Sequence, residues 1–355
     1  MQYDYNGKDV YVGIDVHKKS YTVYCICNRE KVKSWNMRTS PNDVIDQLQR
    51  FFSGARIHTV YEAGFSGYAL HRALEKAGIK NLVVNPGSIE VASRDKVKTD
   101  KRDAKKLAEQ LSDNRLSSIY IPGEQEELLR LLTRLRATFV KDRGRVACRI
   151  KSKLFQFGYD AGLIDDRTIS IEWVKNLKRE EGFPPALKYV IDIFCNQWLR
   201  LTDDLKQINK DLANQSKSDQ QLSALEDIYK SAPGIGTISS KVLSRELGTL
   251  KQFSSNKHAY SFMGLTPSES SSGETRRQGG ISHCGRPYLR QILVEVAWRA
   301  TAKDAEMAKK FAELSHRRGK KRAIVAIARI LVGRLRCCLM NGMIYQMQNG
   351  MAHNE

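Results

Sequence analysis

Asp100 and Asp103 stand three residues apart in a strongly basic stretch of the chain. If this stretch opens a helix that continues through Leu107, both carboxylates lie on one helix face. Thr99 would then be a suitable N-cap, and the helix dipole would favour two negative charges in the first turn. The pair is therefore either a solvated helix end or part of a catalytic site. The surrounding basic residues are candidate nucleic-acid contacts: Lys98, Lys101, Arg102 and Lys105.

Two further acids stand where short β-rich segments end. Asp15 closes an apolar run that begins at Val10, and Glu62 closes one that begins at Ile57. Open α/β sheets present ligand-binding residues at the ends of their strands. Together with the two helical aspartates, these acids can supply the hard oxygen ligands that Mg²⁺ requires, and one or two such ions suit chemistry on a phosphodiester.

Charge and composition indicate the class of partner. The 355 residues include 59 Lys and Arg against 39 Asp and Glu, which gives a formal net charge of +20. Such a surface favours a polyanion, most simply a nucleic acid, because binding releases condensed counterions. An anionic membrane could use the same charge, but we find no secretory segment and no apolar span long enough to cross a bilayer. Seven cysteines without a C-x-x-C pair indicate reduced thiols, so we expect a cytoplasmic protein without membrane association.

The first 120 residues show the pattern of a mixed α/β domain. Three β-rich segments with short polar breaks predict successive hairpins, and helices and strands then alternate. The expected strands are 10–15, 20–27, 31–38, one ending at Glu62, and 81–84; the expected helices begin near Pro41, Tyr68 and Asp100. The order βββαβαβα is that of an RNase H-like layer.

Pro122 and Gly123 mark the first boundary, and two long helical patterns follow. The first, 128–150, has a partly polar seam, and its basic residues make it a candidate nucleic-acid surface: Arg143, Arg145, Arg149 and Lys151. The second runs from Leu187 through Phe194 and Leu201 to Leu212 with spacings of four and three, which is typical of coiled-coil packing. Its partner is either the first helix of the same chain or a second copy of the protein.

The polar tract 214–221 marks the second boundary, and a glycine turn between two helical patterns follows it. Helices are expected at 222–230 and 237–247. Gly234 and Gly236 between them could let backbone N–H groups approach a phosphate, as in a helix-hairpin-helix motif. A simple connection between two helices is the alternative. As a dinucleotide-binding fingerprint the two glycines are a weak match, because no strand precedes them.

The stretch 262–282 is rich in serine and glycine and by composition is a flexible loop. A serine hydroxyl beside Gly273, Arg276 and Arg277 is chemically suggestive, since the arginines could hold a phosphate while the hydroxyl attacks it. Further helices are expected from Pro287 and after the basic run 317–322, and the residues from Asn341 are expected to be frayed.

Taken together, these stretches resemble the transposases of the IS110 family, with their IS1111 relatives and the pilin-gene invertases. The resemblance covers nearly the whole chain. In the N-terminal part it rests on Gly13-Ile-Asp15, Tyr61-Glu62-Ala-Gly64 and Lys98-Thr-Asp100-Lys-Arg-Asp103. In the C-terminal part it rests on Ala232-Pro-Gly-Ile-Gly236, Gly264-Leu-Thr-Pro267, Ser272-Gly273 and Gly279-Gly-Ile-Ser282 with Gly285.

The resemblance implies three domains: a RuvC-like catalytic domain at 1–121, a helical coiled-coil region at 122–221, and a C-terminal transposase domain at 222–355. It implies that Asp15, Glu62, Asp100 and Asp103 form a DEDD tetrad that binds Mg²⁺ or Mn²⁺. It also implies a serine nucleophile, which we assign to Ser272, with Ser270 and Ser271 adjoining it. Related elements pair a structured RNA with target and donor DNA, and the basic helices are compatible with such a guide RNA.

The expected function is therefore DNA transposition through a covalent phosphoserine intermediate, acting on element ends and a target site in a bacterium or archaeon, with the protein associated with the nucleoid. The acids and the serine lie in different domains, so we expect a homo-oligomer, a dimer or tetramer. A site-specific DNA invertase would share this chemistry. A RuvC-like endonuclease would use the tetrad to activate water, and a non-catalytic nucleic-acid scaffold would need neither the acids nor a metal.

Overall fold

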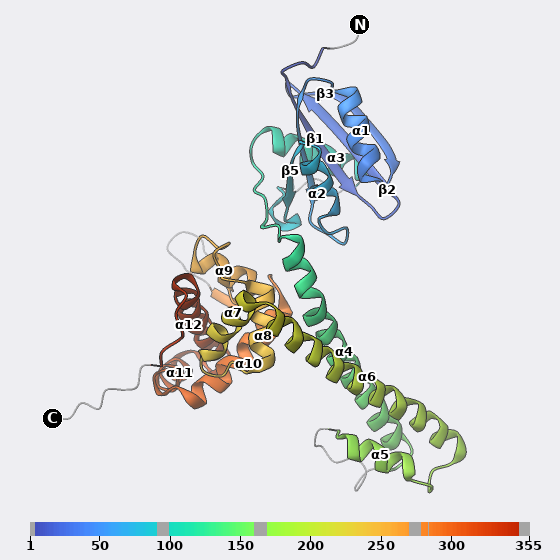
Figure 1. The fold of residues 1–355 in the computed structure, drawn as a ribbon, viewed down its shortest axis with the longest axis vertical. Coiled ribbons are helices and arrows are strands. Elements are labelled where there is room, and N and C mark those ends of the chain that lie inside the picture. The colour runs from blue at the N-terminus through green and yellow to red at the C-terminus, as the bar shows by residue number, and fades with distance from the viewer. Residues whose placement is uncertain (1–3, 91–98, 160–168, 270–277, 283, 348–355) are drawn as a thin grey trace, which may run out of the picture. The chain divides into compact units, whose positions relative to one another are not determined.

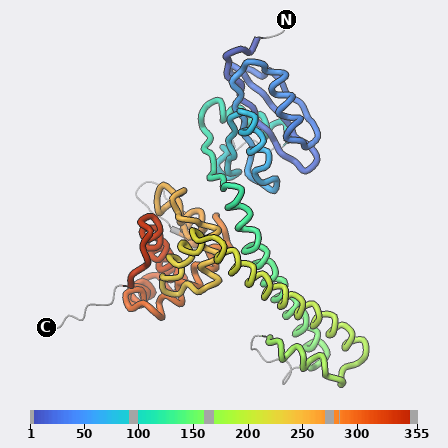
Figure 2. Tube along the Cα trace, viewed as in Figure 1, coloured from blue at the N-terminus to red at the C-terminus, as the bar shows by residue number. Residues whose placement is uncertain are grey.

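The computed structural model describes residues 4–90, 99–159, 169–269, 278–282 and 284–347. The chain divides into two compact units, Met1–Pro122 and Gly123–Glu355, which we describe in turn (Figures 1 and 2). Among the helices in these ranges, none combines the length and the apolar character that a membrane span requires.

The first unit is built on a five-stranded mixed sheet. Its strands are β1 Asp9–Val16, β2 Ser20–Cys27, β3 Glu30–Arg38, β4 Arg56–Glu62 and β5 Lys80–Val84. The first three form antiparallel hairpins, whereas β4 and β5 add in parallel, which gives the order β3-β2-β1-β4-β5. The predicted succession βββαβαβα is confirmed. This mixed α/β architecture is consistent with a RuvC-like fold.

Helices cover both faces of this sheet. Alternate residues of a strand face opposite sides, so β1 directs Val10, Val12 and Ile14 to one face. There they pack with the apolar sides of α1 (Pro41–Phe51) and α2 (Ala69–Lys76). The helix α3 (Asp100–Ser112) packs on the opposite face with the strand residues of two smaller clusters.

Gly13 allows α3 to lie unusually close to β1. A Cβ atom built on Gly13 would lie 2.0 Å from the carbonyl oxygen of Ala104 and 2.7 Å from the amide nitrogen of Ala108. Any larger residue would push the helix away from the strand. The small residues on both elements therefore fix the distance between β1 and the start of α3.

The second unit begins with two long helices. In it α4 (Glu124–Gln156) and α6 (Pro185–Ser218) lie alongside each other, with α5 (Ile171–Arg179) packed near their far end (Figure 1). In the structure α6 packs on α4 of the same chain, which is one of the two alternatives that the sequence left open. A coiled coil between copies of the protein stays a prediction.

The buried stripe of α6 differs from the expected heptad seam. Cys195 and Thr202 are buried, whereas the predicted seam residues Phe194 and Leu201 are only partly buried. A straight α-helix repeats every 3.6 residues, so its buried stripe drifts away from a strict alternation of four and three. Contact with α4 thus follows ordinary helix packing at these two positions.

The remainder of the second unit is mainly helical. Its elements are α7 Gln220–Ser231, α8 Thr237–Leu247, α9 Asn256–Phe262, β6 Pro267–Glu269, β7 Gln278–Ile281, α10 Pro287–Lys303, α11 Ala305–Arg318 and α12 Lys320–Asn341. Side chains from α8, α10 and α12, such as Leu243, Leu293 and Leu331, form the centre of one apolar core. The two helices predicted on either side of the Gly234 turn are present as α7 and α8.

Two segments are more ordered than the sequence indicated. The polar tract 214–221 is mostly helical, because α6 continues to Ser218 and only Asp219 separates it from α7. The expectation of frayed residues after Asn341 was wrong as far as Tyr345. There the buried Tyr345 donates its backbone N–H to the Ser231 hydroxyl at 2.8 Å, and its phenol contacts Arg334 at 3.2 Å.

Candidate functional site

The register of two parallel strands brings two of the predicted acids together. Residues of β1 and β4 pair from Asp9 and Arg56 up to Ile14 and Tyr61, so Asp15 and Glu62 occupy the next matching positions. Because matched residues of neighbouring strands face the same side of a sheet, both carboxylates project on the face that α3 covers. Glu62 itself pairs with Val84 of β5, which belongs to the apolar cluster beneath α3.

The first turn of α3 adds the other two acids. Thr99 is the N-cap, and its hydroxyl accepts a hydrogen bond from the Arg102 amide at 3.3 Å, as the sequence predicted. Asp100 and Asp103 follow in the first turn, and the next residue, Ala104, packs on Gly13. The close approach of helix and strand therefore positions these carboxylates beside Asp15.

His17 lies between two of the acids, and its contribution was not predicted. Its Nε2 atom is 3.1 Å from Asp15 Oδ2 and 3.3 Å from Asp100 Oδ1. The sequence could have indicated this contact, because His17 is two positions after Asp15 and residues i and i+2 of a strand lie on the same face.

Asp15 carries the clearest electrostatic signature in this group. Its side chain is mostly buried, and removal from water raises the pKa of its carboxyl group. The neighbouring negative charges of Asp100 and Asp103 raise this pKa further, while the attraction of His17 lowers it. The ionised form of Asp15 is thus disfavoured at this position.

Such a group suits a divalent cation. Ligand atoms of Asp15, His17 and Asp100 all lie within 4.8 Å of one another. Carboxylate oxygens are the ligands that Mg²⁺ prefers, and an imidazole nitrogen is accepted by Mn²⁺ and other transition metals. The remaining two acids of the predicted tetrad are outside this group of three. Glu62 stands beside Asp15 in register, and Asp103 acts on Asp15 by its charge.

The predicted nucleic-acid contacts of the first unit lie on the outer side of α3. Lys101, Arg102 and Lys105 are exposed there. Lys105 forms a 3.5 Å ion pair with Glu109 one turn later. Lys98 lies outside the described residues.

The basic residues predicted on α4 have unequal surroundings. Arg149 is exposed, and Lys151 is partly buried. Arg145 pairs with Asp142 at 2.9 Å. The guanidinium of Arg143 lies 5.5 Å from the ring centroid of Trp198 on α6, so this residue also takes part in the packing of the two long helices.

Gly234 has a packing role that the sequence did not reveal. It is buried with φ +84°, and a Cβ there would lie 2.4 Å from the carbonyl oxygen of Val296 on α10. A larger residue would not fit there, because the backbone of α10 lies beside Gly234; the expected phosphate contact of its backbone N–H stays a prediction. Gly236, the N-cap residue of α8, is exposed and has open space around it.

The serine-rich loop is bracketed by a two-stranded antiparallel sheet. Pro267 pairs with Ile281 and Glu269 with Gln278, so β6 and β7 hold the two ends of the loop together. The sequence predicted only a flexible loop over this whole stretch. Ser272, Arg276 and Arg277 lie outside the described residues.

Comparisons with known proteins agree with this geometry. A family model described as Transposase, of the DEDD type named for IS110, matches residues 12–158, and a second, described as Transposase IS116/IS110/IS902 family, matches residues 226–312.

Several curated transposases are similar over most of their length. The transposase for insertion sequence element IS1533 of Leptospira borgpetersenii is 26% identical over 304 residues, covering 82% of this chain and 85% of the relative. That for IS1328 of Yersinia enterocolitica is 25% identical, covering 81% and 82%. That for IS1111A of Coxiella burnetii is 26% identical, covering 73% and 71%. The chain belongs to the IS110 family of transposases, enzymes that cut and rejoin DNA.

Proposed function

We propose that this transposase cuts and rejoins DNA at the ends of an insertion sequence and at a target site, with Mg²⁺ or Mn²⁺ held by Asp15, Glu62, Asp100 and Asp103. The observation that carries the proposal is the convergence of Asp15 and Asp100 on His17, with the charge of Asp103 acting on Asp15. Carboxylates crowded at a strand end destabilise one another unless a cation is bound, so their arrangement favours a metal site.

Each residue has a distinct part in this site. A bound divalent ion would offset the negative charge that develops on the phosphodiester oxygens during cleavage. Asp15 lies on the sheet and is mostly buried, so the protein fixes its position. Asp100 and Asp103 belong to the capped first turn of α3, and Gly13 sets the distance between α3 and β1. His17 bridges Asp15 and Asp100 and keeps their oxygens close together.

We further propose that Ser272 is the nucleophile. Its Oγ would bond to the scissile phosphorus while the bond from phosphorus to the leaving sugar oxygen breaks, and the hydroxyl proton would pass to that oxygen. Attack on the phosphoserine by the hydroxyl of another strand would reverse these steps and reseal the DNA without hydrolysis. Arg276 and Arg277 would hold the phosphate in place. Support comes from the β6–β7 pairing, which brings the two ends of the serine loop together.

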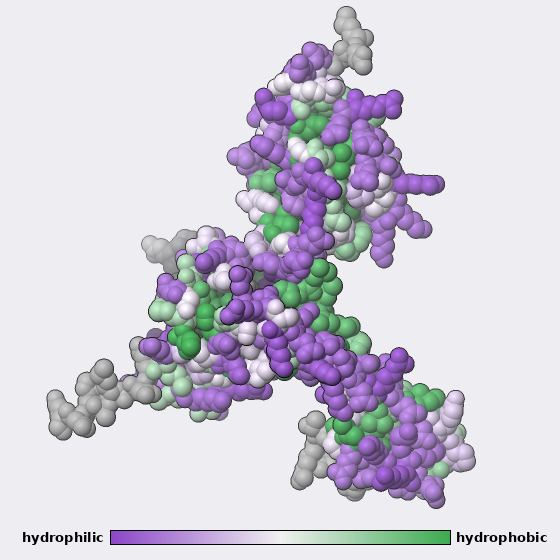
Figure 3. Space-filling view, viewed as in Figure 1, coloured by the Kyte–Doolittle hydropathy of each residue, from purple (hydrophilic) through white to green (hydrophobic). Residues whose placement is uncertain are grey.

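The assembly and its guide are also proposals. We infer that the enzyme acts as a dimer or tetramer, because the acids and the serine belong to different units of the chain. Leu128, Leu131 and Leu135 are exposed along α4, and Figure 3 shows apolar surface over this part of the helix. Such a surface is suited to contact with another protein. A guide RNA that selects target and donor DNA would bind the basic helices, and the three-domain division of the chain stays a prediction.

The proposal is tested by following a labelled element-end DNA on a denaturing gel. Wild-type protein with Mg²⁺ should give a covalent protein–DNA adduct. Ser272→Ala should abolish the adduct while DNA binding persists, and Ser271→Ala should retain it. Asp100→Asn should abolish cleavage, whereas Asp46→Asn, which changes an exposed aspartate of α1, should not.

Three other outcomes of this experiment would contradict the proposed mechanism. Free DNA ends without an adduct would indicate a RuvC-like endonuclease that uses water. DNA binding that depends on salt but not on Mg²⁺ or on any of the four acids, without cleavage, would indicate a scaffold. An adduct that persists in Ser272→Ala protein would move the nucleophile to another residue.

A further inference from the structure

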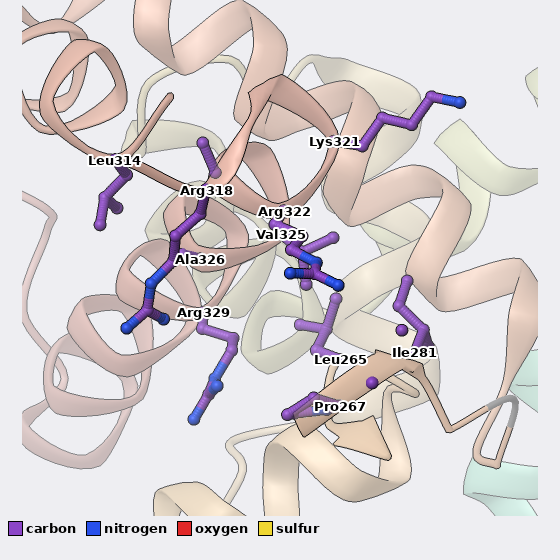
Figure 4. A pocket seen from close by; sticks show the side chains of 13 residues that line it. Leu265, Pro267, Ile281, Leu314, Arg318, Lys321, Arg322, Val325, Ala326 and Arg329 are labelled. Atoms are coloured by element: carbon purple, nitrogen blue, oxygen red, sulfur yellow. The ribbon is translucent and has the colours of Figure 1, made fainter. Parts of the chain in front are cut away.

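A basic cavity lies between the β6–β7 sheet and the last two helices of the second unit. It has a volume of about 450 Å³. One wall is formed by Pro267, Gly279 and Gly280 of the two strands, and the other by residues of α11 and α12 (Figure 4). We refer to it as the α12 cavity. The basic run 317–322 contributes Arg318, Lys321 and Arg322 to its lining.

Four cations line the α12 cavity. Arg318 ends α11, Lys321 and Arg322 belong to the first turn of α12, and Arg329 lies two turns later. Figure 4 shows the guanidinium groups of Arg318 and Arg329 directed toward the same side, with Arg322 over the strands and the amino group of Lys321 extended away from them. The arginines therefore define the basic part of the cavity.

Among the described residues, these cations lack the counter-charges found elsewhere in the molecule. Within the described ranges no Asp or Glu carboxylate forms an ion pair with any of the four, and Arg329 instead lies 4.8 Å from the ring centroid of Tyr260. No acidic residue occupies the first turn of α12, where the helix dipole disfavours positive charge. Like charges gathered in this way raise the local positive potential, which attracts an anionic ligand.

The size and lining of the cavity limit the ligand. The floor is apolar, with Leu265, Ile281 and Val325, and the cations stand around it. Its volume is in the range of pockets that hold one small molecule. The cavity is therefore too small for a nucleic-acid duplex. A nucleotide fits this combination of basic and apolar lining. Proteins that bind single strands combine a basic groove for the phosphates with surfaces on which the bases stack.

We propose that the α12 cavity binds the sugar-phosphate backbone of a single nucleic-acid strand. The cavity wall formed by Pro267, Gly279 and Gly280 belongs to β6 and β7, which flank residues 270–277 in the sequence. A nucleic-acid strand held there would lie beside the two described ends of the serine-rich segment. The proposal rests on the proposed function only for the identity of that strand. The recombining DNA and a guide RNA present the same phosphodiester chemistry, and the experiment separates them.

The test compares two double variants that lose the same charge. Arg318→Ala with Arg322→Ala removes two cavity cations, whereas Arg317→Ala with Lys320→Ala removes two exposed neighbours that do not line the cavity. Binding of fluorescent 12-nucleotide DNA and RNA of the same sequence is measured by anisotropy with the full-length protein in EDTA. Binding is thus measured without cleavage, so its loss is independent of whether the metal site and the serine act as proposed.

The cavity variant should bind at least about tenfold more weakly than wild type, and the dependence of log K on log salt should fall by about 1.4 for two lost phosphate contacts. The control should lose no more than about twofold. Loss for DNA would assign the cavity to the recombining strand, and loss for RNA alone would assign it to a guide. Equal effects of the two double variants, or none from either, would overturn the proposal.

A second measurement does not depend on substitution. Hydrogen exchange of the wild-type protein with and without the 12-nucleotide strands should show protection of residues 278–282 and 318–329 on binding. Circular dichroism should show that both double variants keep the wild-type helix content. Absence of protection in both segments when the strands are bound would also overturn the proposal.

Discussion

The two units of this transposase use buried or crowded carboxylates in opposite ways. In the second unit, Glu226 accepts from Lys241 and from Arg245, each at 2.6 Å, and from the Ser216 hydroxyl at 2.7 Å. All four side chains are buried. In the first unit, Asp15 has the carboxylates of Asp100 and Asp103 as neighbours, and the imidazole of His17 lies 3.1 Å from it. One carboxylate is matched by two cations, and the other is opposed by two anions.

The difference separates a structural use of charge from a functional one. Every oxygen of Glu226 has a donor, so the network joins α6, α7 and α8 without need of a ligand. Asp15 is held in an environment that raises its pKa and so disfavours its ionised form, and a bound cation would offset that cost. Replacing Glu226 by a neutral residue should therefore destabilise the protein, whereas replacing Asp15 by a neutral residue should stabilise it.

The largest effect is expected from Glu226→Gln. The isosteric amide leaves Lys241 and Arg245 buried without a counter-charge, which should cost about 3–5 kcal/mol of the free energy of unfolding. Urea titration followed by circular dichroism measures the loss of unfolding free energy. Hydrogen exchange should locate this loss in α6 to α8. Glu313→Gln, which breaks an exposed pair with Lys310, serves as control and should change stability by less than about 1 kcal/mol. Equal effects would remove the distinction.

Gly13→Ala should have the next largest effect. Its Cβ would overlap the backbone of Ala104, so α3 must shift and the first unit should lose about 1–3 kcal/mol of stability. Cleavage of DNA should fall much more than DNA binding, because Asp100 moves with the helix away from Asp15. Gly87→Ala, where the new Cβ meets only one ordinary contact, is the matched control. Wild-type cleavage by the Gly13 variant would refute the positioning role of α3.

Asp15→Asn should change stability in the opposite direction. The folded protein raises the pKa of this carboxyl above its unfolded value, so the ionised group destabilises the fold once the pH exceeds the folded pKa. In EDTA at pH 7 the amide should therefore stabilise the first unit by about 1 kcal/mol, and cleavage should be lost. The gain should vanish below pH 4, where the unfolded carboxyl is also protonated. A less stable variant at pH 7 would show that the acids are balanced without metal.

The smallest effect is expected at the other end of the same strand. Asp9 contacts Arg56 at 2.6 Å and His58 at 2.9 Å, and these hydrogen bonds hold its pKa well below the usual range. Because the folded pKa is lowered, the stabilisation is present above the unfolded pKa near 4 and is lost as the pH falls through the folded value. Asp9→Asn should cost about 0.2–1 kcal/mol at pH 7 and less at pH 2. Thermal unfolding at the two pH values measures the difference.

Much of the first unit could be predicted from the sequence because its signals are local. The apolar alternation of β1 and the cap at Thr99 depend on neighbouring residues alone, and both elements begin within one residue of the expected positions. The four acids could be singled out because strand ends and helix starts are visible in the same patterns. Their roles as metal ligands stay predictions.

Positions that depend on distant contacts could not be predicted. The fit of Gly13 against α3 and of Gly234 against α10 joins segments about 90 and 60 residues apart, and no local pattern shows which backbone will lie beside a glycine. The partner of α6 was likewise open, since an apolar stripe packs on any complementary helix. The sequence also showed the basic run 317–322 without showing which of its cations gather in one cavity.

The sequence by itself determined the kinds of elements, their order, the acids at the ends of two strands and the net positive charge, because each follows from residue type and local periodicity. Only the tertiary structure decided that His17 joins Asp15 and Asp100, that Glu226 is balanced by two cations, and that arginines from α11 and α12 gather beside the β6–β7 strands. The physical reason is that these contacts form between faces of elements distant in the chain, and their pairing depends on packing over the whole unit.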